Sequence, residues 1–129
     1  LLRAYADGVF PWFNAGDPIL WWSPDPRAVI ELDALHVSRS LARTLRSGRF
    51  RTTANAAFGA VIRGCGVRPG EGTWITDTMV AAYEELHRLG HAHSVESWVK
   101  DANEPGGWAL AGRIYGVAVG GLFAGESMF

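Results

Sequence analysis

The chain has 129 residues, of which 48% are hydrophobic, and a formal net charge of −1 at pH 7. This length suits one domain, or one domain with part of another, and the apolar content excludes a disordered chain. No apolar run approaches the ~20 residues of a membrane-spanning helix. One cysteine, Cys65, excludes an internal disulfide and is typical of a cytoplasmic protein. The chain starts at Leu1 without Met and stops within an apolar run at Phe129, so we expect a fragment.

The small net charge hides two blocks of opposite sign. Residues 27–68 contain eight arginines and two acidic residues, a charge of +6, whereas residues 69–129 contain eight acidic and three basic residues, a charge of −5. Such blocks favour two partners of opposite charge. Eleven of the twelve basic residues are arginine, whose planar guanidinium binds phosphate through paired hydrogen bonds and stacks on bases. The bias indicates a nucleic-acid partner.

The chain begins with the expected end of a helix over Leu1–Ala6, which Gly8 is placed to cap. The next stretch, Phe10–Ile30, is dense in tryptophan and contains prolines that hold it in turns and extended segments. Within it we expect a strand at Ile19–Ser23, paired with a second strand at Arg27–Leu32 across the intervening proline-rich turn.

Three tryptophans of this stretch are candidates to stack on a flat ligand. Trp12 lies in the loop, which favours a binding role over a place in the core. Trp21 and Trp22 would point to opposite faces of the expected strand. For these two, both a binding platform and a place for one of them in the core remain open.

A row of arginines follows on the next expected helix, Arg39–Ser47, which Ser38 would cap. No acidic residue in this helix can pair with them. A phosphate-binding surface is therefore favoured over an ordinary solvated face. The predicted contacts to an RNA backbone are Arg39, Arg43, Arg46, Arg49 and Arg51.

The elements after residue 49 predict an α+β fold with a mixed or antiparallel sheet flanked by helices. A strand is expected at 50–54, a helix at 56–65 capped by Asn55, a loop at 66–72 and a helix at 77–89 capped by Thr76. The period then changes to two, which predicts strands near 94–100, 108–120 and 122–129 with a turn at 101–107. Cys65 lies on the apolar stripe of its helix, which indicates core rather than a nucleophile.

Two familiar site patterns are weak in this chain. His87, His91 and His93 invite a zinc site, but Gly90 ends the helix between them and no acid or cysteine completes a ligand pattern. We therefore predict no metal. The segment Arg113–Ala118 matches the R-x-x-G-x-A pattern of coenzyme A pyrophosphate loops. A loop of this kind binds phosphate at the N-terminus of the helix that follows it. Here the strand pattern continues through the segment, which indicates a chance match.

The strongest catalytic candidate is Glu126. It is a lone carboxylate among apolar residues of the last expected strand. A buried charge needs a partner, which an internal ion pair with Arg113 or another arginine could provide. The functional alternative is that Glu126 receives a cationic substrate.

Several stretches together resemble the leucyl/phenylalanyl-tRNA–protein transferases. They are FPWF at 10–13, GDPILWWSPDPRAV at 16–29, EGTWIT at 71–76, GHAHSVE at 90–96 and GESMF at 125–129. They occur in the family's order along the whole chain. The resemblance implies an N-acetyltransferase-like acyltransferase fold over residues 33–129, cut short at its C-terminus, after part of a small N-terminal domain over residues 1–32 that holds the Trp-rich loop and hairpin.

The resemblance also implies an activity. Family members transfer Leu or Phe, with Met as a third candidate, from aminoacyl-tRNA to proteins that begin with Arg or Lys, which marks those proteins for degradation. Trp12 and Trp74 match positions that hold the terminal adenosine, and Glu126 matches the active-site glutamate. Ile114, Phe123 and Met128 match an apolar pocket for the transferred side chain. No cofactor is implied.

The resemblance predicts an incomplete site, and the residues alone leave two alternative functions open. The family's Asp-x-Gln pair lies beyond Phe129, so the fragment is expected to hold both substrate-binding walls and an incomplete catalytic centre. A non-enzymatic RNA-binding module is one alternative, since the arginines and tryptophans would suffice for it. The other alternative is a coenzyme-A-dependent acetyltransferase. It would require a phosphate-binding loop followed by a helix, which Arg113–Ala118 does not provide.

Overall fold

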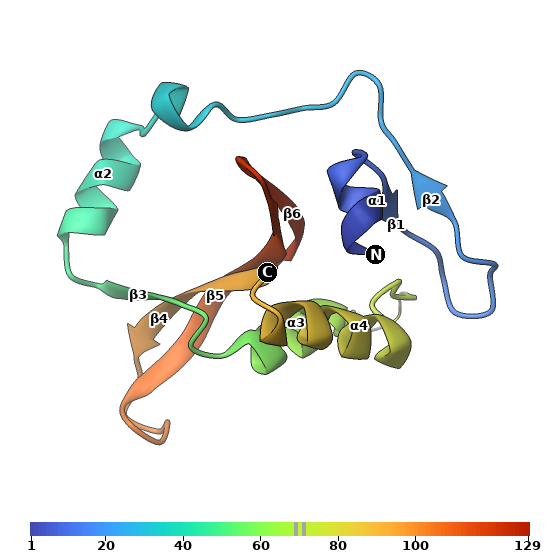
Figure 1. Ribbon diagram of the computed structural model, residues 1–129. Coiled ribbons are helices and arrows are strands. Elements are labelled where there is room, and N and C mark those ends of the chain that lie inside the picture. Colours follow the sequence, from blue (N-terminus) through green and yellow to red (C-terminus); the bar gives the residue numbers. More distant parts are fainter. Residues whose placement is uncertain (69, 71) are drawn as a thin grey trace.

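The computed structural model describes residues 1–68, 70 and 72–129 (Figure 1). Its elements are α1 (Leu2–Ala6), β1 (Phe10–Pro11), β2 (Trp21–Trp22), the 3-10 helix η1 (Leu32–Ala34), α2 (Arg39–Arg46), β3 (Phe50–Ala54), α3 (Phe58–Gly66), α4 (Asp77–Arg88), β4 (Ala92–Lys100), β5 (Trp108–Val119) and β6 (Leu122–Met128). The predicted α+β class, with an antiparallel sheet flanked by helices, is confirmed. The expected loop at 66–72 includes Pro69 and Glu71, which lie outside the described residues.

The main sheet has the order β3-β4-β5-β6, and each neighbouring pair is antiparallel. Its register slips once between β4 and β5, at Ser97/Trp98, and once between β5 and β6, at Tyr115/Gly116. At the second slip Tyr115 pairs with Ser127 and Gly116 pairs with Gly125, so Glu126 is an extra residue in β6. Such a bulge bends its strand and re-aims the side chain it carries.

Helices α3 and α4 pack on each other and on the strands of this sheet. Their apolar stripes form the core with β5, and the most deeply buried side chains include Val61, Ile62, Tyr83 and Tyr115. Cys65 is 3% exposed within this cluster, so its predicted core position is confirmed. Helix α2 contributes no buried residue and stands at the end of a long arc that leaves the body after β2 (Figure 1).

The predicted hairpin between 19–23 and 27–32 is wrong. Strand β2 is only Trp21–Trp22, and it pairs with β1 through Phe10↔Trp22 and Pro11↔Trp21. The indole Nε1 of Trp22 donates to the carbonyl oxygen of Trp12 at 2.8 Å, which reinforces this pairing. Pro24 and Pro26, between the two expected strands, lack an N–H for a ladder, and residues 27–31 run without a sheet partner.

Two helix caps are confirmed and one is wrong. The Ser38 hydroxyl accepts from the Leu41 N–H at 3.2 Å, and Thr76 caps α4 in the same way. Asn55 does not cap α3, because it has φ 59° and uses its side-chain Oδ1 to accept from the N–H of Ser94. The carboxylate of buried Glu96 accepts from the N–H groups of Ala56 and Ala57, just before α3. A residue distant in sequence therefore anchors the turn that leads into α3, and no side chain of the described residues caps this helix.

Candidate functional site

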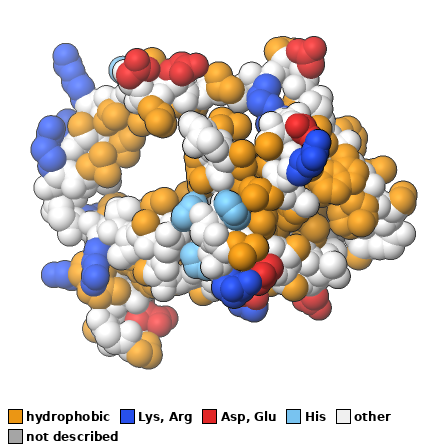
Figure 2. Space-filling view, in the orientation of Figure 1, with side chains coloured by type: hydrophobic (Ala, Val, Ile, Leu, Met, Phe, Trp, Pro, Cys, Tyr) orange, Lys and Arg blue, Asp and Glu red, His pale blue; other side chains and the backbone are white. Residues whose placement is uncertain are grey.

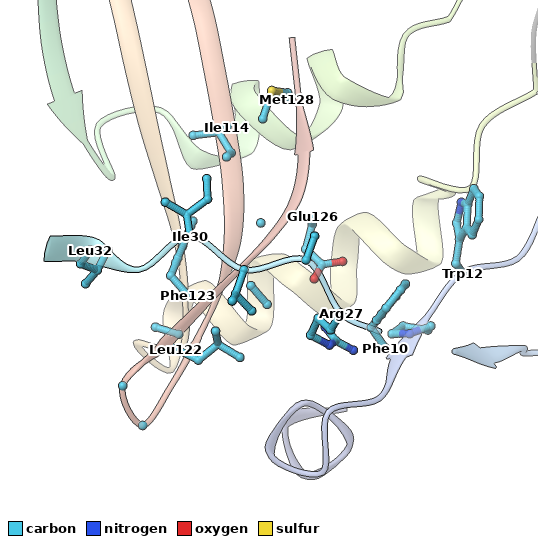
Figure 3. A pocket seen from close by; sticks show the side chains of 18 of the residues that line it. Phe10, Trp12, Arg27, Ile30, Leu32, Ile114, Leu122, Phe123, Glu126 and Met128 are labelled. Carbon is cyan, nitrogen blue, oxygen red and sulfur yellow. The ribbon is translucent and has the colours of Figure 1, made fainter. Parts of the chain in front are cut away.

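One cleft of about 1030 Å³ opens along β6 (Figure 3). Its walls come from β1, the arc after β2, the loop before α4 and the last two strands. The six side chains predicted to contact the aminoacyl-adenosine or the acceptor all line it: Trp12, Trp74, Ile114, Phe123, Glu126 and Met128. They are spread over more than a hundred positions of sequence, and the fold brings them to one surface.

The bulge in β6 directs Glu126 toward the middle of this cleft (Figure 3). Gly116 of β5 makes the bulge possible, because a Cβ there would collide with the Ala124 carbonyl oxygen and lie 2.7 Å from the Phe123 ring. A larger residue at 116 would force the two strands apart. Glycine at this position is therefore a requirement of the geometry that carries Glu126.

Glu126 is held by two tyrosine hydroxyls rather than by an arginine. The Tyr83 hydroxyl donates to Oε2 at 3.0 Å, and it also lies 2.5 Å from the hydroxyl of Tyr5. Within the described part of the chain, the ion pairs are Arg3–Asp7, Arg63–Glu84 and Arg88–Glu85, and none includes Glu126. The predicted alternative of an internal pair with Arg113 is wrong, since the Arg113 guanidinium lies over the Phe129 ring at 4.3 Å.

Burial controls the titration of this group. It raises the pKa of Glu126 above its ordinary value, against the opposing effect of the hydrogen bonds from Tyr5 and Tyr83 and of the charge on Arg27. Burial likewise raises the pKa of both phenols, and the nearby Glu126 adds to that shift. The two tyrosines are therefore neutral donors at every physiological pH.

The two tryptophans of the cleft differ in exposure. Trp12 is 53% exposed, and its ring meets that of Trp22 edge-on with 6.1 Å between centroids. Trp74 is partly buried and packs edge-on against Tyr83 at 6.4 Å. Trp21 and Trp22 are both about half exposed, so the possibility that one of them enters the core is wrong.

The other end of the cleft is apolar. Ile114 of β5 and Met128 of β6 are opposite each other in the ladder, and Phe123 lies further along β6. Sequence reasoning missed the facing wall, which is the extended segment after β2 with the side chains of Val29, Ile30, Leu32 and Leu35. All four are more than half exposed. A run of apolar residues beside prolines was the available signal, but it was assigned to a strand.

Sequence reasoning also missed Tyr5, Tyr83 and Arg27. Tyr83 lies on the apolar stripe of α4 and is buried, but its hydroxyl reaches the site. Arg27 lines the cleft from the arc. Its place in the expected strand at 27–32 predicted an extended backbone only, with no indication of where the side chain would point.

The predicted RNA-contacting arginines lie away from the cleft. Arg39, Arg43 and Arg46 project from α2, and Arg49 and Arg51 lie in or near β3; all five are exposed. Figure 2 shows basic side chains gathered at the end of the molecule where α2 stands. The ion pairs found among the described residues include none of these arginines.

The weaker patterns are engaged in the fold. The segment 113–118 lies inside β5, bonded to β4 and β6, so it opens no helix and the prediction of a chance match is confirmed. The His87 ring stacks on Phe58 at 4.2 Å, and its Nδ1 lies 2.8 Å from the carbonyl oxygen of Ala92. Among the residues described here, no three His, Cys, Asp or Glu side chains gather as metal ligands would. None of the helices in this part of the chain has the length and apolar character to cross a membrane.

Comparison with known proteins agrees with the earlier resemblance. Residues 29–129 match the family model described as leucyl/phenylalanyl-tRNA protein transferase, and residues 1–25 match that of its N-terminal domain. The whole chain is 57% identical to the leucyl/phenylalanyl-tRNA–protein transferase of Escherichia fergusonii, over 52% of that protein. It is 60% identical to the enzyme of Anaeromyxobacter sp. (strain K) and 56% identical to that of Syntrophotalea carbinolica, over 54% of each. The chain spans about half the length of these relatives, and with both family models matched it belongs to the leucyl/phenylalanyl-tRNA protein transferase family.

Proposed function

We propose that the protein containing this chain transfers Leu or Phe from aminoacyl-tRNA to the α-amine of proteins that begin with Arg or Lys. Met is a third candidate for the transferred residue, and modification would mark the acceptor for degradation in the cytoplasm. The observation that carries the proposal is the meeting of two tryptophans, an apolar wall and one partly buried carboxylate in a single cleft. Aminoacyl-adenosine needs an aromatic contact and an apolar contact of this kind.

The adenosine end of the tRNA would stack on Trp12 and contact Trp74. Stacking of a base on an aromatic side chain contributes about 1–3 kcal/mol and does not depend on the rest of the tRNA sequence. The transferred side chain would lie against Ile114, Phe123 and Met128, where a Leu or Phe side chain removes apolar surface from water. The cleft would therefore bind the base of the aminoacyl-adenosine by stacking and its amino-acid side chain by burial of apolar surface.

Glu126 would receive the positive charge of the acceptor protein. An approaching cation favours the ionised carboxylate and so opposes the effect of burial on its pKa. Tyr83 restricts the carboxylate through its hydrogen bond, which limits the positions that an acceptor can take. Arg and Lys side chains both satisfy such a site, whereas neutral side chains do not.

The chemical step is aminolysis of an ester. The acceptor nitrogen forms a bond to the carbonyl carbon, the bond to the ribose oxygen breaks, and the proton lost by the amine balances the one gained by the leaving hydroxyl. Holding amine and ester ~3 Å apart in a cleft that excludes water can provide most of the acceleration. The family resemblance implies that the oxyanion donor and proton acceptor that complete the centre would lie in the part of the relatives that this chain does not span.

The body of the tRNA would contact the arginines of α2 and β3. Their charge is directed to solvent at one end of the molecule, as a backbone contact requires. Such contacts make binding depend strongly on salt. An RNA-binding module without enzymatic activity would use the same arginines, but it would not explain a carboxylate held inside the cleft by Tyr83.

The test is a transfer assay with charged Phe-tRNA and a peptide that begins with Arg. The protein from the full reading frame should yield the Phe-Arg peptide, and the 129-residue chain alone should yield little or none. A peptide that begins with Glu is the matched control and should remain unmodified. Salt-sensitive tRNA binding without any product from the full-length protein would favour the RNA-binding module.

A further inference from the structure

We propose that Arg27 binds the phosphate attached to the terminal adenosine, so that the cleft distinguishes a nucleotide from a nucleoside. This inference rests on the proposed function, because it assumes that adenosine stacks on Trp12. It adds a specificity-determining contact to that site, made by a residue outside the basic row of α2 and β3.

Arg27 is fixed within the cleft by two neutral contacts. Its Nη2 donates to the carbonyl oxygen of Gly8 at 2.6 Å, and its guanidinium carbon lies 5.6 Å from the centre of the Phe10 ring. A guanidinium has five N–H donors in a rigid plane, and the Gly8 contact uses one of them. The other edge of the guanidinium is held in a fixed orientation and keeps free N–H donors. This arrangement suits paired hydrogen bonds to a phosphate.

No acidic side chain among the described residues compensates this charge within ion-pair distance. The ion pairs found there do not include Arg27, and the acidic side chain of the cleft, Glu126, is bonded to Tyr83. Arg27 influences Glu126 through its charge without touching it. The binding free energy of an anionic ligand group is most favourable at an arginine that has no counter-ion and lies beside aromatic and aliphatic side chains.

The position of Arg27 along the cleft fits a phosphate next to a base. Figure 3 shows Arg27 beside Phe10, on the side of Glu126 where Trp12 lies, whereas Ile30, Phe123 and Leu32 lie on the other side. A ligand that places its base on Trp12 and its amino-acid side chain on Phe123 has its sugar-phosphate near Arg27. Stacking alone would hold adenosine and its monophosphate equally, so discrimination would come from Arg27.

The probes are adenosine and adenosine 5′-monophosphate, measured by calorimetry on the protein from the full reading frame. We expect the monophosphate to bind about tenfold more tightly, since a charge-assisted hydrogen bond contributes on this scale. Arg27→Gln should reduce the ratio of the two affinities to about one. Arg27→Lys, which keeps the charge but loses the planar fork, should retain part of the ratio.

Arg3→Gln is the matched control. Arg3 is an exposed arginine that does not line the cleft, and its loss should leave the ratio as it is in the unmodified protein. Equal affinity for both probes in the unmodified protein would overturn the role of Arg27 and leave the adenosine site intact. A tenfold ratio that survives Arg27→Gln would do the same. If neither adenosine nor adenosine 5′-monophosphate binds, both this inference and the proposed adenosine site are overturned.

Discussion

The Tyr83 hydroxyl donates a 3.0 Å hydrogen bond to Oε2 of Glu126, although 43 positions of sequence separate the two residues. Tyr83 is fully buried at the centre of α4, and Glu126 is the bulge residue of β6. A helix of the core therefore positions the carboxylate of the cleft. Stability and function are coupled at this contact, and it provides the first prediction.

Tyr83→Phe should destabilise the full-length protein by about 1–3 kcal/mol, because it removes a hydrogen bond to an ionisable group and leaves the Tyr5 hydroxyl without its partner. It should also raise the pKa of Glu126 further, since the lost bond is one that lowers it. Chemical denaturation and the pH profile of acceptor binding measure the two effects. Tyr115→Phe is the control, because the buried Tyr115 hydroxyl has no hydrogen-bond partner in the described part of the chain, and it should have the smaller effect on the pH profile. A reversed order of the two variants would contradict the role given to Tyr83.

Glu126 should make stability fall as pH rises. Its pKa in the folded protein lies above the ordinary 4.5, so the folded state holds the proton more tightly than the unfolded state. The free energy of unfolding therefore decreases as pH rises from about 4.5 through the folded pKa. Glu126→Gln lacks this titration, and thermal unfolding of both proteins between about pH 3.5 and 8 compares them. Parallel curves for the two proteins would show that burial does not shift this carboxyl.

Gly116→Ala should disturb the bulge. The new methyl group would collide with the Ala124 carbonyl and the Phe123 ring, and overpacking of this kind costs about 1–3 kcal/mol. Gly112→Ala in the same strand is the control, because its nearest neighbour would be the Ser97 Cβ at 3.7 Å. We expect Gly116→Ala alone to lower both the melting temperature and the affinity for the Arg-peptide. Equal behaviour of the two variants would mean that the bulge tolerates a side chain.

Trp12→Ala should weaken adenosine binding by roughly 10- to 100-fold, the amount that corresponds to the loss of one stacked base. Trp21→Ala removes a tryptophan of similar exposure that does not line the cleft, and it should bind adenosine normally. Fluorescence titration of each variant gives the comparison. If Trp21→Ala has the larger effect, the base lies on the outer face of the β1–β2 ribbon instead.

Much of the fold could be predicted because its determinants are local. Ser38 and Thr76 precede helical patterns and cap them as expected, since a cap needs only a hydroxyl three positions before a free N–H. The antiparallel strands of the second half followed from their alternation. Prediction from local sequence failed where a strand has more than one possible partner. Strand β2 could pair with a segment before it or after it in the chain, and only the packed structure shows that the partner is β1.

The site could be predicted in part, through resemblance to relatives rather than through its physics. Trp12, Trp74, Ile114, Phe123, Glu126 and Met128 do line one cleft. The arginine row does not border that cleft, because α2 stands at the end of the arc after β2. Arg27 was missed because an exposed arginine has no pattern of its own until its neighbours in space are known.

By itself, the sequence determined the class of the fold, the places of most helices and strands, and the charge of each half, because these depend on neighbours within a few positions. The tertiary structure alone decided that Glu126 sits on a bulge, that Tyr83 and Tyr5 hold it, and that Arg27 faces the same cleft. These relations join residues far apart in the chain. They arise when the two-stranded ribbon, α4 and β6 pack together, and no short stretch of sequence contains that information.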